Sequence, residues 1–448
     1  GPAERRVRSQ LESAGLPEPS SSHRTARLIA VVARTVLLIA FQFPPMRGSS
    51  AIQRTLRFAQ HLPKFGWKPL VLTATPGAYE QVSTGADSDT GEIRVQRTRA
   101  LDTARHLSLF GRYPRSLAIP DRWVTWKYSA VPAALRLIRE TRIDVVWTTF
   151  PIATAHAVGL AVEQRSGVPW VAEFRDPMWQ GDYPPDPRVN RAWKQLESKV
   201  FERARRVVVT TPGAAQDYRA RFPQFGDANI HVIENGFDEE TFANAESRFR
   251  VRPPTPPAPD RRLKLLHSGV IYPSERDPTC LFDAIALLKL HRDPVAGRLE
   301  VTLRAPGSDL QYQRMIDERQ IGDIVQLAPA IDYVSALEEM LTVDGLLILQ
   351  AANCNAQVPA KIYEYFRAGR PIVALTDAEG DTAQTLRRAG TSLIAPLDSV
   401  AGIAAVLREF VQRTDSHQWR PMSAEAVREF SREHRTEEIA AIFEGLRR

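Results

Sequence analysis

Residues 358–376 read VPAKIYEYFRAGRPIVALT and indicate the class of fold to which the chain belongs. Pro359 suits the first turn of a helix, and Gly369 suits its end. The apolar, partly β-branched run from 371 to 376 that follows is typical of a buried strand. Because a helix leading directly into a buried strand is the repeating unit of a parallel sheet, we expect an α/β fold.

Similar apolar runs recur along the chain and are separated by longer stretches with helical periodicity. The first half contains runs at 35–41, 69–74, 145–149, 170–174, 207–211 and 231–235. The second half contains runs at 263–269, 300–305, 325–328, 345–350, 371–376 and 392–396. This alternation predicts two doubly wound, Rossmann-like sheets that are mostly parallel.

A proline-rich segment, RFRVRPPTPPAPDRR at 248–262, separates the two halves and is typical of a stiff, exposed linker. We therefore expect an N-terminal domain over 35–247 and a C-terminal domain over 263–423. Residues 424–448 are predicted to form helices that pack back across the junction. Residues 1–34 are interpreted as a tail that includes the remnant of a tag.

The composition limits the classes of partner. The formal net charge of +7 and the pI near 9.5 favour anionic partners, such as nucleic acid, a membrane surface or phosphorylated small molecules. Nucleic acid is disfavoured because the basic residues are scattered rather than gathered in one tract. The two cysteines, Cys280 and Cys354, lie far apart without metal-binding spacing, which fits a reducing cytoplasm. The apolar stretch 26–43 is interrupted by two arginines, so we expect a buried strand rather than a membrane span.

Ligands of open α/β sheets bind beyond the carboxyl ends of the strands, so the loops that follow the predicted strands are the candidate sites. In the first loop, Gly48 allows backbone N–H groups to approach a phosphate closely. A plain strand-to-helix turn would need the same residue. In the loop after 170–174, Arg175 and Asp176 are candidates for holding a phosphate or orienting an acceptor. The alternative is a structural ion pair of Arg175 with Asp176 or Glu173.

Two further loops lie in the second half. Ser268 and Gly269 end a predicted strand, and Arg276 follows at a helix start, where its guanidinium can grip a diphosphate. Lys361 and Glu364 share one face near the start of the next candidate helix. There the carboxylate can accept hydrogen bonds from ribose hydroxyls while Lys361 lies close to phosphate. For Arg276, and for Lys361 with Glu364, an ordinary surface ion pair is the alternative.

The order and spacing of several motifs resemble family 4 of the retaining GT-B glycosyltransferases, especially the bacterial branch that builds cell-surface polysaccharides. The resemblance covers about residues 35–445 and rests on FPPMRG, TTFPIATAH, VPWVAEFRDPMW, VIENGFD, SGVIYPSERDP and PAKIYEYFRAGRPIVAL. It implies two Rossmann-like domains facing a cleft, with the donor held by the C-terminal domain and the acceptor by the N-terminal domain.

The resemblance also implies roles for single residues. Glu364 matches the second glutamate of the family's Glu-x7-Glu motif, which is expected on the donor ribose. Arg276 matches the basic residue expected on the diphosphate, and Gly48 lies in the loop expected beside it. Two positions depart from the family pattern: the first glutamate falls at Ala356, and Arg175 stands where many members carry a histidine. These departures leave the sugar open.

The predicted activity is hexosyl transfer, with retention, from a nucleoside-diphosphate sugar to a hydroxyl of a glycan, a lipid-linked glycan or a small molecule. Arg175, Asp176 and Arg276 are the predicted catalytic residues. The predicted donor-binding residues are Gly48, Ser268, Gly269, Arg276, Lys361 and Glu364. No metal and no cofactor beyond the donor co-substrate are expected. Contact with an anionic membrane at the inner face is a further hypothesis, which rests on the basic and aromatic segment 110–126.

Three alternatives remain at this point. A sugar-nucleotide epimerase uses the same architecture. A degenerate nucleotide-sugar-binding scaffold is suggested by Ala356. A nicotinamide-dependent oxidoreductase is disfavoured because it needs a Gly-x-Gly-x-x-Gly turn after the first strand, where this chain has only Gly48.

Overall fold

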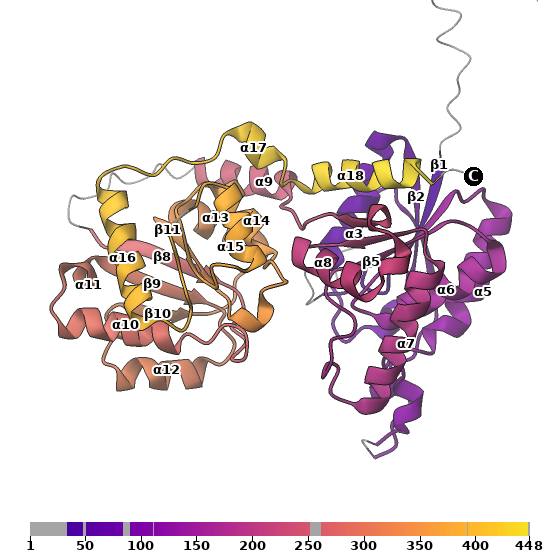
Figure 1. The fold of residues 1–448 in the computed structure, drawn as a ribbon, viewed down its shortest axis with the longest axis horizontal. Helices are drawn as coiled ribbons and strands as arrows, with labels where there is room; N and C mark the ends of the chain where they lie inside the picture. The colour runs from indigo at the N-terminus through magenta and orange to yellow at the C-terminus, as the bar shows by residue number, and fades with distance from the viewer. Residues whose placement is uncertain are drawn as a thin grey trace, which may run out of the picture. The chain divides into compact units, whose positions relative to one another are not determined.

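Two parallel sheets with helices packed against them make up the described structure (Figure 1). The computed structural model describes residues 34–47, 51–83, 90–110, 112–250, 261–391 and 393–446. The strand order is β3-β2-β1-β4-β5-β6-β7 in the first sheet and β10-β9-β8-β11-β12-β13 in the second. Both orders are those of doubly wound sheets, so the predicted fold class is confirmed.

The first sheet forms the core of the N-terminal lobe. Its strands are β1 (Arg34–Ile39), β2 (Trp67–Ala74), β3 (Arg94–Thr98), β4 (Val145–Thr149), β5 (Trp170–Phe174), β6 (Arg206–Val209) and β7 (Ile230–Val232). Its main helices are α3 (Ala51–His61), α5 (Trp126–Glu140), α6 (Ala153–Ser166), α7 (Pro187–Arg203) and α8 (Pro212–Arg221), with a short α4 (Thr103–His106). Strand β3 was not predicted, because its sequence RVQRT lacks an apolar run. It lies at the edge of the sheet, where polar side chains are tolerated.

The second sheet forms the core of the C-terminal lobe. Its strands are β8 (Leu263–Ser268), β9 (Leu299–Arg304), β10 (Val325–Ala328), β11 (Gly345–Leu349), β12 (Ile372–Leu375) and β13 (Ile394–Ala395). Its helices are α10 (Thr279–Leu290), α11 (Pro294–Arg298), α12 (Asp309–Glu318), α13 (Tyr333–Thr342), α14 (Lys361–Ala368), α15 (Asp381–Arg388), α16 (Val400–Asp415) and α17 (Ala424–Arg428). Within residues 358–376, α14 ends at Ala368 and is capped by Gly369, whose φ of 66° is the left-handed conformation that glycine adopts readily.

Helix α9 (Glu239–Arg250) belongs to the core of the C-terminal lobe, although the predicted N-terminal domain, 35–247, includes most of it. Its buried Phe242 and Ala245 share an apolar cluster with α13 and α14. The helix also extends three residues into the segment predicted as a linker, of which 251–260 lie outside the described residues. The chain therefore leaves the N-terminal lobe before α9, where the sequence shows no break in composition.

The last described helix, α18 (Arg432–Glu444), returns to the N-terminal lobe and packs against α3. Ile439 and Phe443 are fully buried in the cluster that contains Leu56 and Trp67. The rings of Phe443 and Trp67 meet edge to face, with centroids 5.4 Å apart. Because this helix follows the whole C-terminal lobe in sequence, it ties the end of the chain to the first sheet.

The apolar run near the N-terminus contributes β1 to the first sheet, and its residues 26–33 lie outside the described part of the chain. None of the helices in the described ranges combines the length and the apolar character needed to span a bilayer. Both cysteines are free, with Cys354 buried and Cys280 half-buried.

Replacement of Phe443 by alanine is expected to lower the free energy of unfolding by about 3 kcal/mol, because it removes a fully buried ring and leaves a cavity against Trp67. Chemical denaturation followed by tryptophan fluorescence measures this loss. Glu437→Ala on the exposed face of the same helix is the control and is expected to change the free energy by less than about 0.5 kcal/mol. Equal stability of the two variants would show that α18 is not anchored in the way described.

Candidate functional site

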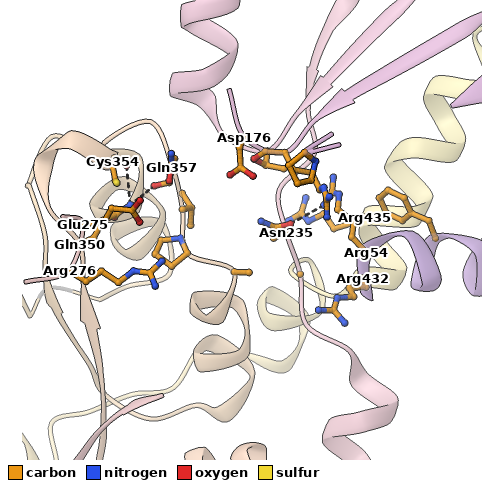
Figure 2. A pocket seen from close by; sticks show the side chains of 18 residues that line it. Arg54, Asp176, Asn235, Glu275, Arg276, Gln350, Cys354, Gln357, Arg432 and Arg435 are labelled. Atoms are coloured by element: carbon orange, nitrogen blue, oxygen red, sulfur yellow. Dashed lines mark hydrogen bonds between the residues drawn. The ribbon is translucent and has the colours of Figure 1, made fainter. Parts of the chain in front are cut away.

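A cavity of about 280 Å³ lies where loops from both sheets meet (Figure 2). Its walls come from the loops after β4, β5, β6, β7, β8 and β11, and from α3 and α18. The lining residues are Arg54, Phe58, Pro151, Arg175, Asp176, Thr210, Asn235, Gly236, Glu275, Arg276, Gln350, Cys354, Gln357, Val358, Pro359, Ala360, Arg432 and Arg435. The cavity thus occupies the place at which doubly wound sheets bind ligands.

The lining carries a strong excess of positive charge. Five of the lining residues are arginines, and only Asp176 and Glu275 are acidic. Figure 2 shows Arg54, Arg432 and Arg435 on one side of the cavity with Asn235, and Arg276 with Glu275 on the other. Guanidinium groups bind phosphate and carboxylate through paired hydrogen bonds, so the cavity is suited to an anionic ligand.

The guanidinium of Arg54, on α3, donates hydrogen bonds to three other residues of the N-terminal lobe. Its Nε donates to Glu173 Oε1 at 2.9 Å, and its two terminal nitrogens donate to the carbonyls of Glu234 and Ile233 at 2.7 and 2.8 Å. Glu173 is fully buried at the end of β5 and also accepts a hydrogen bond from Thr149 at 2.8 Å. Arg54 therefore joins the ends of β5 and β7 and has a structural role.

Arg175 follows β5 and lines the cavity, as does Asp176 beside it. The Arg175 guanidinium donates to the Phe150 carbonyl at 2.6 Å and to Gln42 Oε1 at 3.1 Å. Both acceptors are neutral. Among the described residues, Arg175 forms an ion pair neither with Asp176 nor with Glu173, which pairs with Arg54 instead. Burial lowers the pKa of Arg175 to about 10, so the group stays charged at neutral pH and faces the cavity without a carboxylate partner.

Arg276 lies in the loop that follows β8. Its guanidinium donates to the Val270 carbonyl at 2.8 Å and lies over the ring of Tyr272, 5.1 Å from its centroid. Within the described ranges it has no carboxylate partner, so the surface ion pair that the sequence left open is not present there. Arg276 therefore offers the cavity a guanidinium whose charge the protein does not neutralise by an ion pair.

Lys361 is the first residue of α14, and its Nζ lies 3.1 Å from Nε2 of His267 at the end of β8. Burial, together with the nearby charge of Arg276, lowers the pKa of Lys361 to about 7. Burial also holds the pKa of His267 well below its usual value, so this imidazole is neutral and accepts the hydrogen bond. A Cβ on Gly269, whose φ is 110°, would lie 3.3 Å from Lys361 Nζ. The glycine thus leaves room for the amine.

Glu364 lies one turn further along α14 and accepts a hydrogen bond from the Tyr333 hydroxyl at 2.6 Å. Burial raises the pKa of its carboxyl. The backbone N–H of Ser268 donates to the Tyr365 hydroxyl at 3.3 Å. Ser268, Gly269, Lys361 and Glu364 thus lie close to one another around α14 and the end of β8, beside the cavity rather than in its lining. No ion pair joins Lys361 and Glu364 in the described structure, and Gly48 lies outside the described residues.

Helix α18 contributes two arginines to the site that were not predicted from the sequence. Arg432 and Arg435, in its first turn, line the cavity. Arg435 pairs with Glu438 at 2.8 Å and with Glu234 at 3.4 Å, whereas Arg432 has one buried guanidinium nitrogen without a hydrogen-bond partner among the described residues. Nothing local in the sequence distinguishes these arginines from those of an ordinary amphipathic helix. Only the return of α18 to the N-terminal lobe brings them to the site.

No group of three or more His, Cys, Asp or Glu side chains that could hold a metal ion is present in the part of the chain that the structure describes. The two carboxylates of the lining come from different lobes, Asp176 after β5 and Glu275 after β8.

Among known proteins, a family model matches part of the chain, and solved structures share the fold of nearly all of it. Residues 51–236 match the family model described as a glycosyl transferase 4-like domain. The structure is similar to sucrose-phosphate synthase from Thermosynechococcus elongatus, with a TM-score of 0.62 and 16% identity over 92% of this chain and 99% of that one. It is also similar to WaaG, a glycosyltransferase involved in lipopolysaccharide biosynthesis, with a TM-score of 0.57 and 14% identity over 91% and 99%.

The chain has the GT-B fold. A putative UDP-N-acetylglucosamine 2-epimerase from Listeria monocytogenes is less similar, with a TM-score of 0.50 and 12% identity over 91% of this chain and 95% of that one. No curated protein sequence matches the chain. At these identities the structural likeness establishes the GT-B fold alone, and the domain match at 51–236 supports a glycosyltransferase. A glycosyltransferase domain implies a nucleotide-sugar donor and an acceptor.

Replacement of Glu173 by alanine is expected to lower the free energy of unfolding by about 3–5 kcal/mol, because it leaves the Arg54 guanidinium buried without its partner. Thermal or chemical denaturation measures the change. The matched control is Glu163→Ala, which removes a pair with the half-exposed Arg203 and is expected to cost less than about 1 kcal/mol. A loss at Glu173 no larger than at Glu163 would show that the buried pair does not hold the strand ends together.

Proposed function

We propose that the chain transfers a hexosyl group, with retention, from a nucleoside-diphosphate sugar to a hydroxyl group of an acceptor. The observation that supports this most is the arginine-lined cavity at the strand ends of both sheets of a GT-B fold, in a chain whose residues 51–236 match a glycosyl transferase 4-like domain. The acceptor is a glycan, a lipid-linked glycan or a small molecule, and the family branch is the bacterial one that builds cell-surface polysaccharides.

The donor is proposed to bind along the loop after β8 and the start of α14. Arg276 and Lys361 hold the diphosphate, since both present positive charge beside the cavity and neither is neutralised by an ion pair in the described structure. The backbone of Ser268 and Gly269 lies next to the Lys361 amine and gives the phosphates room to approach. Glu364 accepts hydrogen bonds from the ribose hydroxyls in place of the Tyr333 hydroxyl that it binds here. The loop that contains Gly48 is proposed to lie beside the diphosphate.

The chemical step places growing negative charge on the departing diphosphate. Arg276 and Lys361 stabilise that charge, and fixed cations in a site of low polarity act more strongly than they would in water. The bond from the anomeric carbon to the diphosphate breaks through an oxocarbenium-like state, and the acceptor hydroxyl attacks from the face that the diphosphate leaves and passes its proton to a departing phosphate oxygen, which gives retention. Arg175 and Asp176 orient the acceptor from the N-terminal lobe. Turnover is proposed to survive chelation, since the side chains supply the positive charge.

Binding of nucleoside diphosphates tests the first requirement of the proposal. We expect at least one ligand of a panel to raise the melting temperature of the full chain by several degrees, because a ligand that binds only the folded state stabilises it. The panel consists of UDP, GDP, ADP and dTDP, followed by their sugars. Release of that diphosphate from its sugar in the presence of candidate acceptors then measures transfer. A chain that binds none of them would contradict the proposal.

Two other functions give different results in the same assay. An epimerase would convert the donor without an acceptor, whereas a transferase leaves the sugar configuration of unreacted donor unchanged. A binding scaffold would retain the donor intact, without hydrolysis or transfer.

Replacement of Arg276 by alanine is expected to reduce turnover by about a hundredfold, since the loss of one charge-stabilising donor costs on the order of 3 kcal/mol in the transition state. The measurement is release of nucleoside diphosphate under saturating donor, with circular dichroism to confirm folding. Arg314→Ala, an exposed arginine on α12 of the same lobe, is the control and should leave turnover unchanged. Unaltered turnover in the Arg276 variant would refute its assignment.

The lowered pKa of Lys361 gives donor binding a pH dependence. Below pH 7 the amine is charged and attracts the diphosphate; above pH 7 it becomes neutral, so affinity for the diphosphate selected by the panel is expected to fall roughly fivefold between pH 7.5 and 8.5. Isothermal titration calorimetry in buffers of different ionisation enthalpy should show proton uptake on binding at pH 8. In Lys361→Gln both effects should disappear. A pH-independent affinity in the wild type would contradict the role of Lys361.

A surface on the N-terminal lobe favours contact with an anionic membrane. Leu109 and Phe110 are 72% and 96% exposed, and the backbone N–H groups of Leu109 and Arg112 each donate to the carbonyl of the other residue. Two further arginines, Arg105 and Arg115, flank these residues in sequence. Exposed apolar side chains with arginines nearby are typical of segments that insert at a lipid interface.

The double variant Leu109→Ser, Phe110→Ser is expected to lose at least tenfold in binding to vesicles that contain phosphatidylglycerol, measured by co-sedimentation at low salt. Leu310→Ser, at an equally exposed leucine (81%) of the C-terminal lobe, is the matched control and should bind as the wild type does. A wild type that does not bind these vesicles would remove the membrane proposal without affecting the transferase proposal.

A further inference from the structure

The position of the missing family glutamate, Ala356, faces the other lobe rather than the cavity. Its carbonyl accepts a hydrogen bond from the Thr211 hydroxyl at 2.7 Å. A Cβ built on Gly213, in the first turn of α8, would lie 3.2 Å from the Ala356 Cβ. Ala356 is also absent from the lining, although the residues from 357 to 360 belong to it. A side chain at this position is therefore directed at α8 and is not needed to line the cavity.

A different carboxylate lies in the cavity on the same lobe. Glu275 lines it directly beside Arg276, and Figure 2 shows both next to Gln350, Gln357 and Cys354. Within the described residues, the Glu275 carboxylate has no hydrogen-bond or ion-pair partner, and the side-chain amide of Gln357 has none either. Burial, and after it the charge of Glu275, raises the pKa of the Cys354 thiol, and Cys354 lines the same cavity.

The backbone around Glu275 is fixed, so the position of its side chain is restricted. The Glu275 carbonyl accepts a hydrogen bond from the backbone N–H of Ala351 at 2.7 Å, and the Glu275 N–H donates to the Tyr272 carbonyl at 3.0 Å. The neighbouring Ser274 carbonyl accepts from Asn353 Nδ2 at 2.9 Å. The loop after β11 thus holds the loop after β8, which limits the positions that the Glu275 carboxylate can reach.

We propose that Glu275 binds hydroxyl groups of the donor sugar and restricts the donor to an uncharged hexose. This inference rests on the proposed function, in which Arg276 holds the diphosphate. The sugar is bonded to that diphosphate, so its hydroxyls lie within reach of the residue next to Arg276. An ionised carboxylate is a strong acceptor for hydroxyl groups. The same charge repels the carboxylate of a uronic acid, which would be held close beside it.

The test compares how much each sugar adds to diphosphate binding. The probes are UDP, UDP-glucose and UDP-glucuronic acid, or the guanosine counterparts if the panel selects GDP, bound to the full chain and measured by calorimetry. In the wild type, glucose is expected to be favoured over glucuronic acid at least tenfold. Glu275→Gln, which keeps the shape and removes the charge, is expected to reduce this preference to about threefold or less. Glu275→Ala is expected to lose the favourable contribution of glucose as well.

Glu318→Gln makes the same charge change at an exposed position of α12, away from the cavity, and should leave the preference as in the wild type. A preference for glucose that is equal in the wild type and in Glu275→Gln, or a wild type that favours glucuronic acid, would overturn this inference while the transferase proposal stands. A wild type that binds no nucleoside diphosphate would overturn both. Folding of each variant is checked by its affinity for the free diphosphate, which should stay within about threefold of the wild-type value.

Discussion

Glu234 lies just after β7 and pairs with Arg388 at the end of α15 and with Arg435 in the first turn of α18. Its own carbonyl accepts a hydrogen bond from Arg54, whose guanidinium pairs with the buried Glu173. One buried carboxylate and its neighbours therefore connect both sheets and the last helix. Because leaving a buried charge unpaired costs several kcal/mol, the buried pairs of Glu234 with Arg435 and of Glu173 with Arg54 hold together elements that line the cavity.

The direct contacts between the lobes support the same arrangement. The Thr211 hydroxyl donates to the Ala356 carbonyl at 2.7 Å, and the Gly213 N–H donates to Asp381 Oδ2 at 2.8 Å. Both donors lie at the start of α8, where the N–H groups of the first turn have no partner within the helix. Asp381 of the C-terminal lobe supplies that missing acceptor for Gly213, so each of the two contacts joins a backbone group of one lobe to a side chain of the other.

This arrangement divides the arginines of the cavity into two kinds. Arg54 and Arg435 are paired with carboxylates and act structurally. Arg175, Arg276 and Arg432 bind only neutral groups or have a nitrogen without a partner in the described structure. The second kind presents guanidinium groups to the cavity outside any ion pair among the described residues, which favours an anionic ligand there. The structural pairs therefore position the unpaired cations, and the unpaired cations select the ligand.

Much of the fold could be predicted from the sequence because buried parallel strands are nearly continuous apolar runs, and each of the twelve predicted runs overlaps a strand of the two sheets. The edge strand β3 was missed because it is polar. The loops that hold Arg175, Arg276 and Lys361 could be predicted because ligands bind beyond strand ends. The pairing of Arg54 with Glu173, 119 residues away, and the arrival of Arg432 could not, since neither leaves a local pattern. The membership of α9 in the second lobe depends likewise on contacts distant in sequence.

The most direct test of the account is a crystal structure of the chain with the selected nucleoside diphosphate bound. Phosphate oxygens are expected within hydrogen-bond distance of Arg276 and of Lys361, the first residue of α14. The remaining space of the cavity should be open toward Arg175 and Asp176. A diphosphate bound outside this cavity, or within it but in contact with neither Arg276 nor Lys361, would contradict the claim that these unpaired cations form the donor site.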